Sequence, residues 1–269
     1  MKKVIKADII SNKKIAPDHF VMEIGAKWLA ENALPGQFVL VKLRDKGTDP
    51  LLRIPIGVHD KTKNGIKMLY KTVGTGTEIL SRKRKGEEID ILGPIGNSFD
   101  LEGVGKKTRV IIVAGGHGIA PLYGLAKTLA PKCRVDVFAG ACSRKHVVYS
   151  KEIKKLGAGF HTSTEDGTCG LKGYITELVD SHLKLATSDK RQATRIFACG
   201  PRPMLAELAR VLKKHGLPAQ FSLDAYMACG IGACQGCAIR TKDGYKLVCK
   251  DGPVFGADEI DWEREKSGS

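Results

Sequence analysis

Four cysteines near the C-terminus constrain this chain more than any other feature of its sequence. They are Cys229, Cys234, Cys237 and Cys249, in the spacing Cys-x4-Cys-x2-Cys-x11-Cys, whereas the chain's other four cysteines are widely separated. This spacing is the plant-type pattern for the ligands of a [2Fe–2S] cluster. A structural zinc site usually takes two short cysteine knuckles separated by a longer spacer, and free buried thiols are the remaining alternative. We therefore predict a [2Fe–2S] site with these four cysteines as its ligands.

Small residues surround the first three of these cysteines. Glycines and alanines leave little side-chain bulk there, so the backbone can wrap a cluster and direct N–H groups at its sulfides. The fourth cysteine follows a predicted hairpin, with strands over 238–241 and 245–248 on either side of a glycine-containing turn. Residues 221–269 are thus predicted to form a cluster-binding loop subdomain.

The middle of the chain, residues 104–220, alternates between short apolar runs and amphipathic stretches. Short continuous apolar runs are typical of buried parallel strands. They predict strands over 109–114, 134–141, 159–164 and 195–199. Amphipathic stretches predict helices over 122–129 and after Pro201. This part is therefore predicted to be an α/β domain with a doubly wound parallel sheet.

A glycine-rich turn, residues 115–121, follows the first of these strands. A strand, such a turn and then a helix let backbone N–H groups meet a pyrophosphate. The turn is not the G-x-G-x-x-G fingerprint, so a purely structural tight turn is an alternative. Ligands of open α/β sheets collect at the C-terminal strand ends, where this turn and Cys199 lie. Cys199 by itself could equally be a buried small apolar residue.

The N-terminal part, residues 1–103, lacks long helical periodicity apart from a short stretch over 27–32. Short β-rich runs with Gly or Pro turns between them predict a small antiparallel barrel. These runs cover 4–10, 20–24, 38–43, 66–73 and 88–92. A Gly-Thr-Gly-Thr segment at 74–77 precedes a predicted short helix over 78–82. It is either a second phosphate cradle or a plain N-cap by Thr75 or Thr77.

Charge and hydropathy narrow the choice of partners. The net charge of +15 suggests nucleic acid or acidic lipid, but the basic residues are scattered, their clusters are short and only 6% of residues are aromatic. A solvated basic surface, offset by anionic cofactors or an acidic partner, is therefore favoured over nucleic acid. The longest apolar run, 110–114, is too short to cross a membrane, and the N-terminus lacks an apolar signal segment. We expect no membrane partner and a cytoplasmic protein.

Three motifs carry a family resemblance: LGPIGNSF at 92–99, ACGPRPM at 198–204 and, above all, SLDAYMACGIGAC at 222–234. Over its whole length the chain resembles the ferredoxin reductase-like flavoproteins, and among them the electron-transfer subunits of dihydroorotate dehydrogenase B. The resemblance implies an oxidoreductase subunit with FAD in the barrel, NAD(H) in the second domain and a [2Fe–2S] cluster in the third. It also implies a catalytic flavoprotein partner subunit in a hetero-oligomer, and a role in pyrimidine biosynthesis.

The resemblance also implies roles for individual residues. FAD contacts carry over to Arg53, Ile54, Pro55, Ile56, Gly57, Leu69, Tyr70, Lys71, Gly76 and Thr77. Nicotinamide nucleotide contacts carry over to Gly115, Gly116, Gly118, Ile119, Cys199, Gly200, Pro201 and Met204. Cys199 is the catalytic candidate, as a contact on the nicotinamide side and not as a nucleophile. Ser143, Arg144 and Lys145 could grip a 2′-phosphate and favour NADP(H), or could form a solvated loop; the resemblance alone favours NAD(H).

The flavin segment departs from the family pattern Arg-x-aromatic-Ser/Thr. Arg53 lies one position early, and Gly57 has no hydroxyl to offer the flavin. The Arg-Ile-Pro sequence is more similar to the small subunit of the flavin-bifurcating NADH/NADPH:ferredoxin oxidoreductases, a sister family. That bifurcating subunit is therefore one alternative. A second alternative is a self-contained reductase for soluble acceptors. A third, in a different class, is a zinc-bearing basic module that binds nucleic acid.

Overall fold

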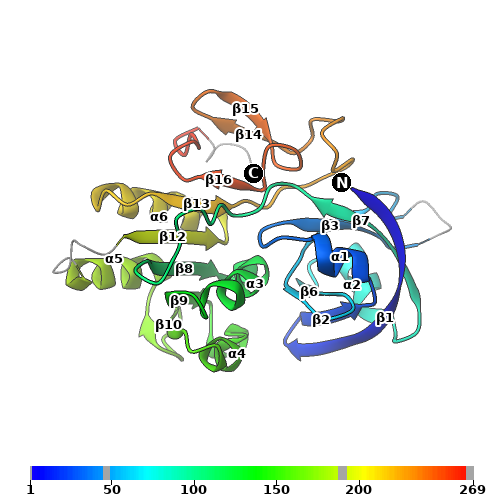
Figure 1. The fold of residues 1–269 in the computed structure, drawn as a ribbon, viewed down its shortest axis with the longest axis horizontal. Helices are drawn as coiled ribbons and strands as arrows, with labels where there is room; N and C mark the ends of the chain where they lie inside the picture. The colour runs from blue at the N-terminus through cyan, green and yellow to red at the C-terminus, as the bar shows by residue number, and fades with distance from the viewer. Residues whose placement is uncertain (1, 45–48, 187–192, 265–269) are drawn as a thin grey trace. The chain divides into compact units, whose positions relative to one another are not determined.

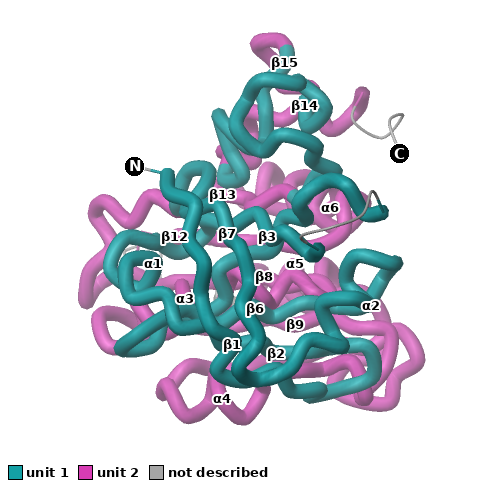
Figure 2. Tube along the Cα trace, turned by 90° about the vertical axis from the view of Figure 1, so that its right-hand side faces the viewer, with its two compact units in different colours: residues 1–98, 224–239, 245–254 teal, residues 99–223, 240–244, 255–269 magenta. Residues whose placement is uncertain are grey.

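The structure, a computed structural model, describes residues 2–44, 49–186 and 193–264. The chain divides into two compact units, which Figure 2 distinguishes by colour. The first unit is Met1–Ser98 with Asp224–Ile239 and Tyr245–Val254, and the second is Phe99–Leu223 with Arg240–Gly244 and Phe255–Ser269. The three-part division into residues 1–103, 104–220 and 221–269 stays a prediction.

The first unit contains a seven-stranded antiparallel sheet (Figure 1). Its strands are β1 (Lys3–Ala16), β2 (His19–Ile24), β3 (Phe38–Lys42), β4 (Ile54–Gly57), β5 (Asp60–Lys61), β6 (Ile66–Lys71) and β7 (Glu88–Ile95). Their order is β4-β3-β7-β1-β2-β6-β5, and β4 contacts β6, so the sheet curls towards a barrel. The predicted antiparallel barrel is confirmed.

Strand β1 extends beyond the predicted run 4–10. Its first half pairs with β7 and its second half pairs with β2, with an irregularity between Ile9 and Ser11. The second half is polar, Ser-Asn-Lys-Lys, so its β structure has no apolar signal in the sequence. Two short helices close the unit's core, α1 (Lys27–Asn32) with buried Leu29 and α2 (Thr75–Arg82) with buried Leu80.

The second seven-stranded sheet has the order β11-β10-β9-β8-β12-β13-β16. Its strands are β8 (Arg109–Gly115), β9 (Arg134–Ala141), β10 (Gly159–Thr164), β11 (Leu171–Lys172), β12 (Thr194–Cys199), β13 (Ala219–Ser222) and β16 (Val254–Gly256). The pairs from β11 to β13 are parallel, and the four predicted strands are among them. The predicted doubly wound parallel sheet is confirmed.

Helices follow the strands of this sheet: α3 (Ile119–Leu129), α4 (Ser150–Lys155), α5 (Ile175–Ala186) and α6 (Arg202–Lys214). Helix α3 contacts α4, and α5 contacts α6. These two pairs of helices are expected when all crossovers are right-handed and the direction of winding reverses partway along the sheet. The reversal lies between the neighbouring strands β8 and β12. A crevice at the C-terminal ends of such strands is where open α/β sheets bind ligands. No helix within the described ranges is long and apolar enough to cross a lipid bilayer.

A polar cluster around one buried carboxylate lies near the N-terminal ends of β8, β9 and β10. Its centre is the Asp136 carboxylate, which is 4% exposed and lies 3.2 Å from His161 Nε2, 3.3 Å from Arg134 Nε and 3.6 Å from Arg109 Nε. Burial alone would raise the pKa of Asp136, but the His161 hydrogen bond and the two guanidinium groups hold it below its usual value. Asp136 is therefore ionised throughout the neutral range.

His182 of α5 borders this cluster. Its Nε2 hydrogen-bonds the Arg109 guanidinium, and its ring meets that of Phe138 edge-on at 4.9 Å. Burial and the positive charge of Arg109 together lower the pKa of His182 from 6.5, although Asp136 opposes them. The folded protein therefore holds this imidazole neutral over a wider pH range than the unfolded chain does.

We predict that the free energy of unfolding falls as pH drops below about 6.5 because of His182. Its folded pKa lies below the unfolded value, so its stabilisation is complete above the unfolded pKa. That stabilisation is lost as pH falls through the folded pKa, because the unfolded chain binds the proton more readily. His182→Gln cannot titrate and should lose less stability between pH 7.5 and pH 5.5, measured by urea unfolding. Equal losses in both proteins would contradict the assignment.

Candidate functional site

The four predicted cluster ligands lie in the first unit and form two pairs. The Cys234 N–H donates to Cys229 Sγ at 3.4 Å, and the Cys249 N–H donates to Cys237 Sγ at 3.5 Å. Among the residues that the structure describes, no three His, Cys, Asp or Glu side chains are arranged to hold a single metal ion. One tetrahedral zinc needs four ligands around one point, whereas each iron of a [2Fe–2S] cluster takes two protein ligands. The pairs therefore fit the two-iron group.

Backbone N–H groups point at these sulfurs. The Ile231 and Cys234 N–H groups donate to Cys229 Sγ at 3.5 and 3.4 Å, and they lower the pKa of that thiol to about 6. The N–H of Gly236 donates to Cys234 Sγ at 3.4 Å. Burial, with the neighbouring Cys237 thiol, raises the pKa of Cys249 to about 12. The loop thus favours negative charge at its open edge, and its buried Cys249 needs a bound metal to become a thiolate.

The cysteine loop is fixed to the barrel of the same unit at two places. Gly230 has a φ of +64°, and a Cβ there would come within 2.3 Å of Leu40 Cδ1, so only glycine fits. Asn97, just after β7, donates from its side chain to the Asp251 carbonyl at 2.7 Å and from its backbone to Gly252 at 2.6 Å. The hairpin β14 (Ala238–Thr241) and β15 (Gly244–Leu247) lies between Cys237 and Cys249, as predicted.

Two of the segments assigned to FAD come together in the first unit. A Cβ on Gly76, at the start of α2, would lie 3.2 Å from Ile54 Cγ2 of β4. The side chains of Ile54 and Ile56 pack in the barrel core. Leu69 and Tyr70 of β6 are also fully buried. Contacts from the buried Ile56, Leu69 and Tyr70 to a ligand would therefore come from their backbone, whereas Ile54 is only half-buried.

Helix α2 presents free N–H groups at its first turn. Thr77 Oγ1 accepts hydrogen bonds from the N–H groups of Val73 and Gly74, and the first intrahelical bond is that from Glu78 N–H to the Gly74 carbonyl. The N–H groups of residues 75–77 precede this bond and have no acceptor within the helix. The helix begins three residues before the predicted 78–82, because Thr77 closes the preceding turn. Such a terminus fits a phosphate.

Arg53 is held by an acidic partner. Its guanidinium lies 2.9 Å from the Asp90 carboxylate and donates to the Asp90 carbonyl at 3.2 Å. Both side chains are largely buried. The guanidinium of Arg53, a predicted FAD contact, is thus paired with a carboxylate of β7.

In the second unit, the two predicted nucleotide turns pack backbone to backbone. A Cβ on Gly118 would lie 2.0 Å from the Cys199 carbonyl oxygen, and one on Gly200 would lie 3.0 Å from Gly115 Cα. Met204 of α6 covers both Gly115 and Gly200. This packing requires glycine on both sides and brings the strand ends of β8 and β12 to one place.

The remaining nucleotide residues divide by exposure. Gly116, with a φ of +51°, and Pro201 are exposed at the turns, whereas Ile119 and Cys199 are buried. The Cys199 side chain is only 1% exposed at the end of β12. The structure therefore places all eight predicted nucleotide residues at one edge of the sheet, while their contacts with a nucleotide stay a prediction.

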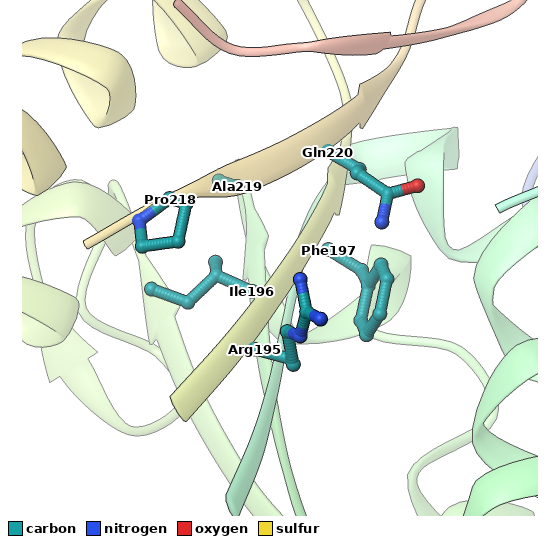
Figure 3. A pocket seen from close by; sticks show the side chains of 6 residues that line it. All are labelled: Arg195, Ile196, Phe197, Pro218, Ala219 and Gln220. Carbon is teal, nitrogen blue, oxygen red and sulfur yellow. The ribbon is translucent and has the colours of Figure 1, made fainter. Parts of the chain in front are cut away.

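A small hollow lies elsewhere in the second unit, along β12 and β13 (Figure 3). It is lined by Arg195, Ile196, Phe197, Pro218, Ala219 and Gln220. Its polar groups are already engaged, because Gln220 bonds the backbone of Asp100 twice and Arg195 donates to the Glu102 carbonyl. The hollow contains none of the predicted cofactor residues.

Two family models match parts of this chain. Residues 112–210 match the oxidoreductase NAD-binding domain, and residues 224–261 match the iron-sulfur cluster binding domain of dihydroorotate dehydrogenase B. The dihydroorotate dehydrogenase B (NAD(+)) electron transfer subunit of Desulforamulus reducens is 36% identical over 98% of this chain and 100% of its own length. This chain belongs to that family. The corresponding subunit of Fusobacterium nucleatum is 35% identical over 97% of this chain and its entire own length.

Solved structures support the same fold. The structure of an NADH-dependent reduced ferredoxin-NADP oxidoreductase, studied for flavin-based electron bifurcation, is 30% identical with a TM-score of 0.83 over 97% of this chain and 91% of its own. A ferredoxin NADP+ reductase from Neisseria gonorrhoeae, solved with bound FAD and NADP, has a TM-score of 0.66 at 17% identity over 80% of this chain and 92% of its own. The predicted family, fold class and oxidoreductase class are confirmed.

We predict that Gly118→Ala destabilises the protein by about 1–3 kcal/mol, since its methyl group would overlap the Cys199 backbone and force the two turns apart. NADH affinity should fall with it. Urea unfolding and NADH titration measure the two effects. Gly105→Ala is the matched control, because a Cβ there meets nothing within 4 Å. An unchanged Gly118→Ala protein would show that the turns do not need this contact.

We predict that Cys234→Ser loses most of its iron and acid-labile sulfide, with the visible absorption of the cluster, because one iron then keeps a single thiolate. Iron and sulfide assays after anaerobic purification measure the loss. Cys142→Ser is the control, since Cys142 is an exposed thiol of the second unit that hydrogen-bonds Glu165. Equal iron in the two variants would contradict the ligand assignment.

Proposed function

We propose that this chain is the electron-transfer subunit of a B-type dihydroorotate dehydrogenase. It moves electrons between a nicotinamide nucleotide, FAD and a [2Fe–2S] cluster, to or from a catalytic flavoprotein subunit of pyrimidine biosynthesis. The observation that carries the proposal is the paired arrangement of four cysteines, Cys229 with Cys234 and Cys237 with Cys249, on a chain that matches its relatives over their whole length. The named relatives are themselves electron transfer subunits, so the partner is proposed as the catalytic subunit of the same hetero-oligomer.

The first unit is proposed to bind FAD and the cluster. The N–H groups at the start of α2, with Gly76 and Thr77, hold the pyrophosphate, and the backbone of residues 53–57 and 69–71 contacts the rest of the molecule. Cys229 and Cys234 hold one iron, and Cys237 and Cys249 hold the other. The N–H groups directed at these sulfurs favour added negative charge, so they raise the reduction potential relative to a bare four-thiolate site.

The second unit is proposed to bind NAD(H) at the glycine turns. Gly115, Gly116, Gly118 and Ile119 approach the nucleotide from the β8 side, and Cys199, Gly200, Pro201 and Met204 approach it from the β12 side. The short contacts between these turns fix the strand ends, and an exposed Gly116 lets a phosphate approach the backbone. Cys199 is assigned a contact on the nicotinamide side. NADP(H) stays an alternative through the basic segment 143–145.

When bound, these groups would supply the redox chemistry. FAD would accept two electrons as a hydride and release them singly, and the cluster would carry one electron at a time. The chain positions these groups and offsets their charge. Its net charge of +15 neutralises part of the negative charge that nucleotide phosphates and cluster thiolates bring. Its eight free cysteines suit a reducing compartment, so we place the protein in the cytoplasm.

A second candidate is the small subunit of a flavin-bifurcating oxidoreductase. Two observations favour it. One is the likeness to the structure of the NADH-dependent reduced ferredoxin-NADP oxidoreductase. The other is the Arg53-Ile54-Pro55 sequence, followed by Gly57 at the position where the family has a hydroxyl. The two candidates share the same cofactors. They differ in the partner subunit and in the final electron acceptor.

The experiment is anaerobic purification of the tagged chain together with its native partner. We expect a brown complex with FAD, equal iron and acid-labile sulfide, and NAD+ reduction that depends on dihydroorotate. Cys234→Ser should abolish this coupled activity while NADH-to-dye reduction persists, because the dye takes electrons before the cluster. A partner that couples NADH and NADPH to ferredoxin would select the bifurcating candidate instead. A colourless chain after cofactor reconstitution would overturn both.

A further inference from the structure

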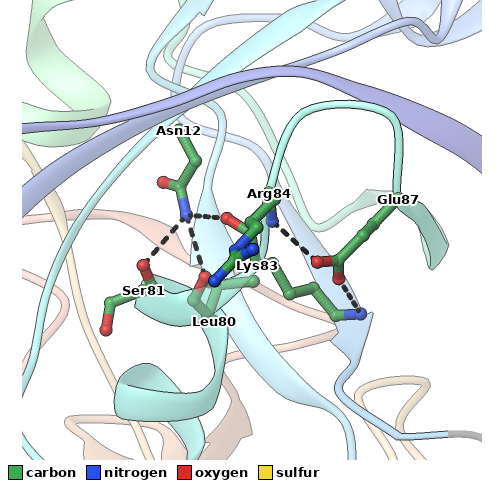
Figure 4. Close-up of polar contacts among 6 residues, drawn as sticks. All are labelled: Asn12, Leu80, Ser81, Lys83, Arg84 and Glu87. Atoms are coloured by element: carbon green, nitrogen blue, oxygen red, sulfur yellow. Dashed lines mark hydrogen bonds and ion pairs between the residues drawn. The ribbon is translucent and has the colours of Figure 1, made fainter.

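Asn12 joins β1 to the C-terminal end of α2 (Figure 4). Its amide nitrogen donates to the carbonyls of Leu80 and Lys83 at 3.0 Å each, and to that of Ser81 at 3.4 Å. An amide nitrogen carries two hydrogens, so at least one is shared between two carbonyls. These carbonyls end α2, where intrahelical donors run out. One side chain thus contacts three carbonyls at the C-terminal end of the helix.

The other end of the same amide is held by β6. The Tyr70 hydroxyl donates to Asn12 Oδ1 at 2.8 Å. Tyr70 is 1% exposed, and its ring stacks on that of Phe20 at 5.7 Å, so the hydroxyl has a fixed position. A donor at Oδ1 determines which end of the amide faces α2, because it leaves the NH2 group pointing at the helix. Tyr70 therefore orients Asn12.

The turn after α2 reinforces this attachment. The Glu87 carboxylate accepts hydrogen bonds from the Arg84 N–H at 3.0 Å and from the Lys83 ammonium at 3.4 Å (Figure 4). The N–H of Ile9 on β1 donates to the Glu87 carbonyl, and the Ile9 carbonyl accepts a hydrogen bond from the Gly86 N–H. The C-terminal end of α2 is therefore anchored to β1.

The N-terminal end of α2 lies at the surface. A Cβ on Gly74 would meet nothing within 4 Å, and Val73 beside it is 77% exposed. Eight residues make a helix about 12 Å long, so a tilt of about 10° at the anchor moves this end by about 2 Å. A hydrogen bond to phosphate tolerates only a few tenths of an ångström. The position of the N-terminal end of α2 therefore depends on how firmly its C-terminal end is attached to β1.

We propose that Asn12 is a positioning residue for flavin binding: its amide fixes α2 on the barrel so that the N–H groups of residues 75–77 meet the FAD pyrophosphate. This inference rests on the proposed function, which places FAD at α2. It also gives the buried Tyr70 side chain a role through Asn12. Asn12 acts at the far end of the helix from the phosphate.

The test is the rate at which FAD leaves the purified holoprotein, followed by flavin fluorescence after dilution. Asn12→Asp keeps the shape and the Tyr70 acceptor but turns a donor into a charge facing three carbonyls, and Asn12→Ala removes the donor without adding charge. Both should release FAD about tenfold faster, as the loss of one or two hydrogen bonds implies. Tyr70→Phe, which removes only the orienting donor, should have a smaller effect in the same direction.

The matched control is Asn32→Asp. Asn32 ends α1, and its amide donates to the Trp28 carbonyl of the same helix at 2.8 Å, but no predicted FAD contact lies on that helix. It should release FAD at the wild-type rate. Hydrogen exchange at residues 75–77 should quicken in the Asn12 variants alone. The cluster spectrum and the NADH affinity of these variants should match those of wild type, whereas a general folding defect would change both.

The outcomes separate the two hypotheses. If the wild-type protein holds no FAD and takes up none, the proposed function fails. If wild type holds FAD and both Asn12→Asp and Asn12→Ala release it at the wild-type rate, only the positioning role is overturned. If Asn12→Asp does not fold, faster release from Asn12→Ala still supports the role, and an unchanged rate there refutes it.

Discussion

In the proposed cluster site, four thiolates lie around two irons, although a hairpin separates the fourth cysteine from the third. Like charges in such proximity repel one another by several kcal/mol at an effective dielectric constant of about 20. The loop offsets this repulsion with N–H groups aimed at three of the sulfurs and with the metal itself. The distant Cys249 is brought into place by the Asn97 contacts to residues 251 and 252. Pairing the thiols thus depends on attaching the loop to the barrel.

That attachment has a consequence for electron transfer. The residues assigned to FAD and the four cysteines all belong to the first compact unit, whereas the nucleotide turns belong to the second. The spacing between the proposed flavin phosphate site and the cluster ligands is therefore set by contacts within one unit, such as that of Gly230 with Leu40. In the second unit, the corresponding precision comes from the contact of Gly118 with the Cys199 carbonyl, where the winding of the sheet reverses.

Features with a short-range signal could be predicted from the sequence. The cysteine spacing, the apolar strand 109–114 and the glycine turns at 115–118 and 199–201 all combine residue type with local spacing, and the structure places them as expected. The second half of β1 escaped prediction because its pairing with β2 does not need apolar side chains. Helices α4 and α5 and the strands β13 and β16 were also not predicted. Asn12 carried no signal, since its three acceptors lie 68 to 71 residues away.

The Arg53–Asp90 pair explains why anchoring α2 matters in this chain. A phosphate that attracted Arg53 would leave the largely buried Asp90 carboxylate without its partner, and an uncompensated charge of that kind is costly. Arg53 is engaged by Asp90 in this structure, so the proposed pyrophosphate site relies more heavily on the N–H groups of α2. Neutral N–H groups have shorter reach and stricter geometry than a flexible guanidinium. Recognition that depends on them requires a helix whose position is fixed, which is what the contacts of Asn12 supply.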